Sequence, residues 1–277
     1  MKNLKEIISL PLDRKIIIRK NFLLNCIILT FLSALVAVGS SKFLFKYNLP
    51  VDNFVTLETS GTLEIICEDE FLDSGVLSHI ECENEIYEIY TSRASAGALS
   101  RVGGVTYLLT ADHFCDTDDM TRNIPPEMTD SISIKRKIYK DGNEYEFSIL
   151  KQNPDTDLCL ISSEDYIVDE KLKLAKSMPE LGELTTTVSS PLGVSEDGVS
   201  LHFSGTFSGC NSTACFFTIP AISGSSGSLV LNYEKEVIGI TQRSLVGFPE
   251  VTIGVGIYDI TEFIREYEAE SDIDITP

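Results

Sequence analysis

The stretch "AISGSSGSLVLN", residues Ala221–Asn232, places a run of small residues directly before an apolar segment that is typical of a strand. Glycine loses more conformational freedom on folding than any other residue, so two glycines at this place need a physical reason. One interpretation is a plain flexible turn. The other is a backbone bent so tightly that the hydroxyl of Ser226 and several N–H groups converge on one point. Other parts of the chain decide between the two.

Two earlier stretches could supply chemical partners for Ser226. His113 stands in "GGVTYLLTADHFC", directly after a run apolar enough for a buried strand. Asp157 stands in "KQNPDTDLCLISS", before another apolar run, where a carboxylate is costly unless it is hydrogen-bonded. Taken singly, they fit an ordinary rim histidine and a turn-capping aspartate. Taken in chain order with Ser226 in a G-x-S-G pattern, they predict a catalytic Ser-His-Asp group.

These motifs resemble those of the trypsin-like, chymotrypsin-fold serine peptidases, especially the bacterial HtrA-type and glutamyl-endopeptidase-type branches. The similarity covers roughly residues 57–268, including a closing strand and helix in "GVGIYDITEFI". It implies an all-β fold of two antiparallel six-stranded β-barrels with a C-terminal helix. The catalytic residues are then expected in the cleft between the barrels.

The resemblance implies a role for each motif residue. His113 would take the proton of Ser226, Asp157 would fix the imidazole tautomer, and the N–H groups of Gly224 and Ser226 would form an oxyanion hole. This chemistry needs no metal and no cofactor, and its substrates are proteins or peptides. The predicted function is a serine endopeptidase that works through an acyl-enzyme. The alternative is a catalytically silent relative that binds extended peptides along a strand edge.

The residues expected around the substrate side chain carry no carboxylate. Counting back six places from Ser226 puts Pro220 at the base of the specificity pocket, followed by Ala221, while Thr241 and Arg243 fall on its wall. A cationic side chain would lack a partner there, and burying an unpaired charge is costly. We therefore expect cleavage after alanine, valine, leucine or similar residues rather than after arginine or lysine. Arg243 leaves a glutamate preference open.

One departure from the family pattern bears on the chemistry. Asp112 stands where the family usually has alanine, directly before His113. A second carboxylate beside the base is expected to raise the pKa of His113.

The N-terminal region differs from the rest of the chain in charge and hydropathy. Residues 1–46 hold eight of the 22 basic and two of the 42 acidic residues, so residues 47–277 carry a formal charge of −26. Such a surface repels phosphates and excludes nucleic-acid binding. Phe22–Ser41 is twenty residues without charge, long enough for a transmembrane helix. Six basic residues precede it, which predicts a cytoplasmic N-terminus and an extracytoplasmic remainder.

The predicted organisation is therefore that of a single-pass membrane protein. It comprises a cytoplasmic basic segment at 1–21, a transmembrane signal anchor at 22–41, a linker at 42–56, a trypsin-like peptidase domain at 57–270 and an acidic tail at 271–277. A cleaved signal peptide, which would release the domain, is the other interpretation of the N-terminal segment. The sequence leaves the oligomeric state open.

Seven cysteines accompany this topology. Cys26 falls in the membrane segment, and an even six lie on the translocated side, where disulfides form. The pairs nearest in sequence are Cys210–Cys215 and Cys67–Cys82, but the pairing cannot be derived from the sequence. Cys159 alternates into an apolar strand pattern, which is also typical of a simple buried thiol.

Overall fold

The computed structural model describes residues 49–65, 85–117, 132–197 and 199–277. The predicted membrane segment at 22–41 and the cysteines Cys26, Cys67 and Cys82 lie outside these residues. Within the described part, no helix is long and apolar enough to cross a membrane. All elements below belong to one compact unit, Pro50–Pro277.

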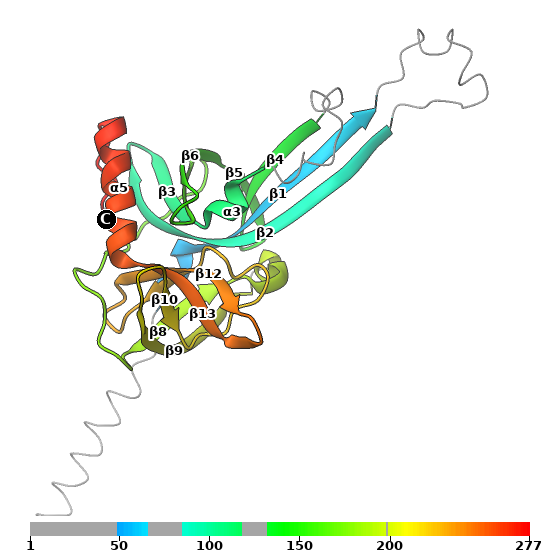
Figure 1. Ribbon diagram of the computed structural model, residues 1–277. Coiled ribbons are helices and arrows are strands. Elements are labelled where there is room, and N and C mark those ends of the chain that lie inside the picture. Colours follow the sequence, from blue (N-terminus) through cyan, green and yellow to red (C-terminus); the bar gives the residue numbers. More distant parts are fainter. Residues whose placement is uncertain (1–48, 66–84, 118–131, 198) are drawn as a thin grey trace, which may run out of the picture. The chain divides into compact units, whose positions relative to one another are not determined.

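The first half of this unit is an antiparallel sheet with the strand order β5-β4-β1-β2-β3-β7-β6. A short 3-10 helix, Val51–Asn53, precedes it, and a one-turn helix, α3, follows β3 (Figure 1). The bounds are β1 Phe54–Ile65, β2 Glu85–Val102, β3 Val105–Thr110, α3 Asp112–Cys115, β4 Ile132–Lys140, β5 Asn143–Glu146, β6 Ser148–Asn153 and β7 Leu158–Ser163.

The second half is a closed six-stranded barrel with the order β10-β13-β12-β11-β8-β9. A C-terminal helix, α5, follows it directly. The bounds are β8 Leu184–Ser189, a 3-10 segment at Pro191–Asp197, β9 Leu201–Cys210, β10 Cys215–Phe217, β11 Leu229–Leu231, β12 Val237–Leu245, β13 Phe248–Gly256 and α5 Ile257–Ser271.

The prediction of two closed six-stranded barrels is confirmed for the second half and needs correction for the first. There the ladder runs over seven strands and does not close. Its two edge strands, β5 and β6, are consecutive and are separated only by Phe147. Phe147 is buried in the core of this half and lies between the two strands. One continuous segment thus supplies both edges, and its two parts do not pair with each other.

The strands that lead into the site are buried on both faces. In β3, "VTYLLT", five of six residues are buried, and β7, "LCLISS", is buried at all but one position. These two strands pair along Thr106–Thr110, inside the sheet. Strands buried in this way hold the segments at their ends in fixed positions; His113 lies in α3 at the end of β3, and Asp157 lies in the turn before β7.

The C-terminal helix packs as its sequence period predicts. Its apolar residues at i, i+3, i+4 and i+7 form one face, and Ile260, Phe263, Ile264 and Tyr267 are all buried. The ring of Tyr267 lies 6.3 Å from that of Tyr107 in β3, so α5 joins the second half to the first. The chain end continues this contact: Ile275 is buried, and Ser100 donates a hydrogen bond to its carbonyl.

Candidate active site

His113 is placed by a single helical turn at the end of β3. Thr110, the last residue of β3, donates its hydroxyl to the carbonyl of Ser95. Ala111 is extended, and α3 begins at the next residue. Phe114 and Cys115 are buried in the sheet core, whereas the side chain of His113 is about half exposed. The turn therefore leaves the imidazole open to the solvent side of the sheet.

Asp157 is placed by a tight turn between β6 and β7. The side-chain oxygen of Asn153 accepts hydrogen bonds from the N–H groups of Asp155 and Thr156. From β12, the side chain of Gln242 donates to the carbonyl of Thr156. Asp157 itself has φ of 55°, in the left-handed region that aspartate tolerates better than most residues. Polar contacts from two elements thus fix the turn that presents this carboxylate.

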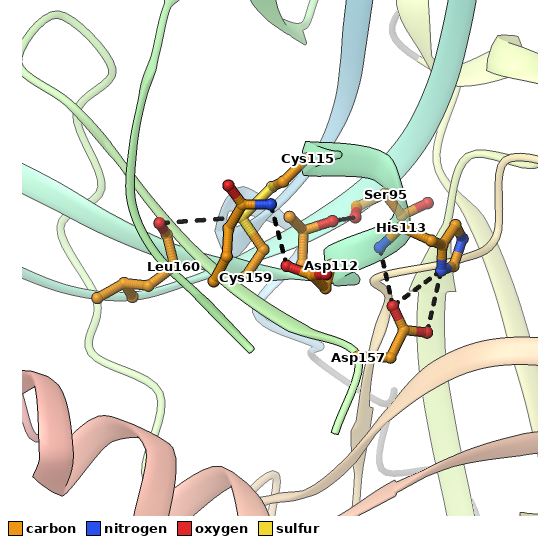
Figure 2. Close-up of a disulfide and its surroundings, with 9 residues drawn as sticks. Ser95, Asp112, His113, Cys115, Asp157, Cys159 and Leu160 are labelled. Carbon is orange, nitrogen blue, oxygen red and sulfur yellow. Dashed lines mark hydrogen bonds and ion pairs between the residues drawn. A yellow bond between two sulfur atoms is a disulfide. The ribbon is translucent and has the colours of Figure 1, made fainter. Parts of the chain in front are cut away.

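The two residues meet directly (Figure 2). Oδ1 of Asp157 accepts the backbone N–H of His113 at 2.9 Å, and both carboxylate oxygens lie 3.0 Å from Nδ1 of the imidazole. The hydrogen bond to Asp157 raises the pKa of His113 above its ordinary value of 6.5, against the opposing effect of burial. This geometry holds the Nδ1–H tautomer, so Nε2 is free to act as a base.

Ser226 lies on the same cleft as this pair. The cleft has a volume of about 640 Å³, and His113, Asp157 and Ser226 are among its lining residues. In this structure the hydroxyl of Ser226 donates to the carbonyl of Gln242 at 2.7 Å. The serine is therefore turned toward β12, and in the described part of the chain it makes no hydrogen bond to the imidazole.

The loop around Ser226 needs its glycines. Gly224 has φ of 90° and Gly227 has φ of 85°, and a Cβ at Gly227 would lie 2.1 Å from the carbonyl oxygen of Ser95. The N–H of Ser225 bonds to the carbonyl of Ile222. Among the described residues, the N–H groups of Gly224 and Ser226 have no hydrogen-bond partner. These are the two donors that the sequence predicts for an oxyanion hole.

Ser95 of β2 fastens this loop, and sequence reasoning missed it. Its N–H donates to the carbonyl of Ser226 at 2.8 Å, and its hydroxyl donates to the carbonyl of Gly224 at 2.8 Å. The hydroxyl also accepts the N–H of Ser190. Ser95 is buried, so the nucleophile loop is held by a strand of the other half. The run of small residues around Ser95 was the available signal, because only small side chains allow such a close approach.

Of the four residues predicted for the substrate pocket, one lines the cleft and three do not. Arg243 lines the cleft, whereas Pro220, Ala221 and Thr241 are not among its lining residues. Pro220 is exposed, and the other two are buried. The cleft lining also includes Ile222, Ser223 and Ser244.

Three carboxylates are among the residues that line the cleft. They are Asp112, Asp116 and Asp157. Asp112 is buried, and Gln152 donates to its Oδ1 at 3.1 Å. Burial raises the pKa of Asp112 above its ordinary value, and its charge is one of the influences that raise the pKa of His113. The expected effect of Asp112 on the base is therefore present in the structure.

Two disulfides occur in the described residues. Cys210–Cys215, one of the two near-neighbour pairs, is present and joins β9 to β10. Cys115 is bonded to Cys159, so the interpretation of Cys159 as a simple buried thiol is wrong. The sequence could not give this pairing, because the two cysteines are 44 residues apart and only the fold brings them together.

A pH profile tests the influence of Asp112. A base works only when neutral, so activity should rise with pH through the pKa of His113, with its midpoint above pH 6.5. The substitution Asp112→Asn removes a negative charge and keeps the Gln152 contact, so the midpoint should move to lower pH. The measurement is kcat/KM against pH for both proteins. A midpoint that stays in place or moves upward would contradict this assignment.

Comparison with known proteins agrees with the fold and the motifs. The family model described as a trypsin-like peptidase domain matches residues 95–240. A search of curated proteins gave no match to this chain. Among solved structures, the Rv3671c protease of M. tuberculosis is similar. An inactive mutant of it gives a TM-score of 0.53 at 10% identity, covering 82% of this chain and 94% of that chain. Its active form gives 0.54 at 9% identity, covering 80% and 84%.

At such low identity the structural likeness shows the fold alone. The family model spans more than half of the chain, and its matched region contains His113, Asp157 and Ser226. The chain therefore belongs to the trypsin-like peptidase family, a family of serine endopeptidases.

Proposed function

We propose that this chain hydrolyses peptide bonds through a His113-Asp157-Ser226 triad and an acyl-enzyme. The observation that carries the proposal is the His113–Asp157 pair, which shares a cleft with Ser226. Nε2 of His113 takes the proton of Ser226 as Oγ attacks the substrate carbonyl, and then gives it to the leaving amine. His113 then takes a proton from water in the same way, and this water hydrolyses the acyl-enzyme.

Two further features support this mechanism. The N–H groups of Gly224 and Ser226 are available to the developing oxyanion, and losing one such donor typically raises the barrier by roughly 2.7–4 kcal/mol. The Ser226 hydroxyl must leave the carbonyl of Gln242 before it bonds to His113. Catalytic hydrogen bonds often form only when substrate is bound, so the resting contact is compatible with activity.

The cleft chemistry supports an apolar or small residue before the scissile bond. Ile222, Ser223 and Ser244, which line the cleft, offer no carboxylate to a substrate side chain, and the carboxylate of Asp157 is engaged with His113. We expect cleavage after alanine, valine, leucine or similar residues, measured by digesting a peptide library with the purified protein and sequencing the products by mass spectrometry. A dominant preference for arginine or lysine would contradict this assignment. A glutamate preference would instead identify Arg243 as the selecting residue.

We also propose that residues 22–41 tether the peptidase domain at 57–270 to a membrane and that the domain lies on the extracytoplasmic side. The support is the uncharged segment with its basic leader. Added protease should degrade the domain while cytosolic markers stay protected, in intact cells or once the outer barrier around a periplasm or lumen is permeabilised, and N-terminal sequencing should find residues 1–21 still attached. A mature N-terminus near Ser40 would replace the anchor by a cleaved signal peptide. Protection together with cytosolic markers would overturn the orientation.

The second candidate is a silent relative that binds extended peptides. The observation in its favour is the hydroxyl of Ser226, which is bonded to Gln242 rather than to His113. Covalent labelling of Ser226 separates the two functions, because only an activated serine reacts.

A further inference from the structure

We propose that the Cys115–Cys159 disulfide is a positioning element of the catalytic pair, which holds His113 against Asp157. Cys115 lies two residues after His113, and Cys159 lies two residues after Asp157. A chain of covalent bonds therefore runs from the histidine through the disulfide to the aspartate. The hydrogen bonds between His113 and Asp157 close this chain into a ring.

The disulfide also completes the attachment of the segment that carries His113. Thr110, just before this segment, pairs with Cys159 in the ladder between β3 and β7. Cys115, at the end of α3, is bonded to the same Cys159. The segment 110–115 is thus fastened to one residue of β7 at both ends, with His113 between the two attachments. Figure 2 shows the disulfide end of this arrangement beside His113 and Asp157.

Local structure alone stabilises neither His113 nor Asp157 strongly, so both residues depend on contacts with their surroundings. The helix α3 has only four residues and no side-chain cap, so local hydrogen bonding stabilises it weakly. Asp157 has a left-handed backbone that is sparsely populated outside glycine, and such a conformation persists only when its surroundings fix it. Because Cys115 and Cys159 are both buried, the cross-link is anchored in the core and can transmit that rigidity.

The second disulfide provides a matched comparison. Cys210–Cys215 joins two residues that already face each other in the ladder between β9 and β10. It is not bonded to any residue of the segment that carries His113 or of the turn that carries Asp157. A general effect of losing a cross-link should lower the melting temperature, by less for Cys210–Cys215 because it closes a shorter loop. A positioning effect on kcat and on the His113 pKa should appear only with Cys115–Cys159.

The test compares the wild type with Cys115→Ala/Cys159→Ala and with Cys210→Ala/Cys215→Ala. The first variant should lose about tenfold or more in kcat, with KM within about twofold, because substrate contacts are kept while the base is misplaced. Its His113 pKa, followed by NMR of the imidazole, should fall toward 6.5 as the contact with Asp157 loosens. Asp112 and Arg243, which also influence this pKa, are unchanged in both variants. The control should keep the wild-type kcat and the wild-type His113 pKa.

The kcat measurement rests on the proposed function, but the NMR titration does not. If the wild type were inactive, the proposed function would fail and the His113 titration would still decide the inference. If the first variant did not fold, the folded wild type would be treated with dithiothreitol. The dithiol gives two electrons and two protons to the S–S bond, which becomes two thiols while the reagent forms a cyclic disulfide. Alkylation then shows which disulfide has opened.

Opening of Cys115–Cys159 with the fold retained should lower kcat and the His113 pKa together. The inference is overturned if the protein without this disulfide has only a lower melting temperature, while its kcat and its His113 titration match those of the control.

Discussion

The substitution Ser226→Ala should lower kcat by about a millionfold while the protein remains folded. The hydroxyl is the only atom lost, and the structure gives it one hydrogen bond, to the carbonyl of Gln242. Loss of one such bond typically changes the free energy of unfolding by about 0.5–1.5 kcal/mol, which is small against the loss of the nucleophile. The measurement is peptide hydrolysis, with circular dichroism as the check on folding.

The neighbouring serine supplies the control. Ser225 is buried, and its hydroxyl accepts the N–H of Ile222, so Ser225→Ala should keep most of the activity. A variant with both Ser226→Ala and His113→Ala should be scarcely slower than either single variant, because the triad acts as a unit. An inactive Ser225→Ala protein would show that the nucleophile is misassigned. A double variant whose loss of kcat is the product of the two single losses would show that Ser226 and His113 do not act together.

The substitution Asp157→Asn should lower kcat by about ten-thousandfold with little change in shape. The aspartate accepts two N–H groups of His113, one from the backbone and one from the ring. An amide in its place can turn its NH₂ toward Nδ1, which favours the tautomer with the proton on Nε2. Such an imidazole cannot take the proton of Ser226.

Asp155→Asn is the matched control for this variant. Asp155 lies in the same turn, and it joins the turn through its backbone N–H rather than through its carboxylate. The activity of the Asp155→Asn protein should stay close to that of the wild type. The kcat/KM of Asp157→Asn should also recover partly at high pH, where the general base becomes less important. An Asp157→Asn protein as active as the Asp155→Asn protein would show that the carboxylate does not orient His113.

The sequence predicted the residues of the candidate site better than their surroundings. His113, Asp157 and Ser226 could be found because each lies at the end of an apolar run or in a glycine-rich turn, and such local patterns are visible without a fold. Ser95 could not be found in this way. Its contacts with Gly224 and Ser226 depend on β2 passing beside a loop that is 129 residues away in the chain.

The features of the fold that the sequence did not predict also depend on contacts between distant parts of the chain. The partner of Cys115 depends on the register between β3 and β7, which places Cys159 opposite Thr110. The open order of the first sheet depends on which distant strands β5 and β6 pair with: β5 pairs with β4 and β6 with β7, on opposite edges. By contrast, the apolar face of α5 was predictable, because a helical period is written in consecutive residues.

The central claim is that Ser226 is an activated nucleophile, and reaction with a fluorophosphonate probe tests it most directly. The purified wild type should be labelled once, and mass spectrometry should find the label on Ser226, with no labelling of Ser226→Ala. Labelling should become faster as the pH rises through the pKa of His113, which the contact with Asp157 holds above 6.5. A folded wild type that the probe does not label, or labels at another residue, would contradict the mechanism, and the absence of any label would favour the peptide-binding alternative.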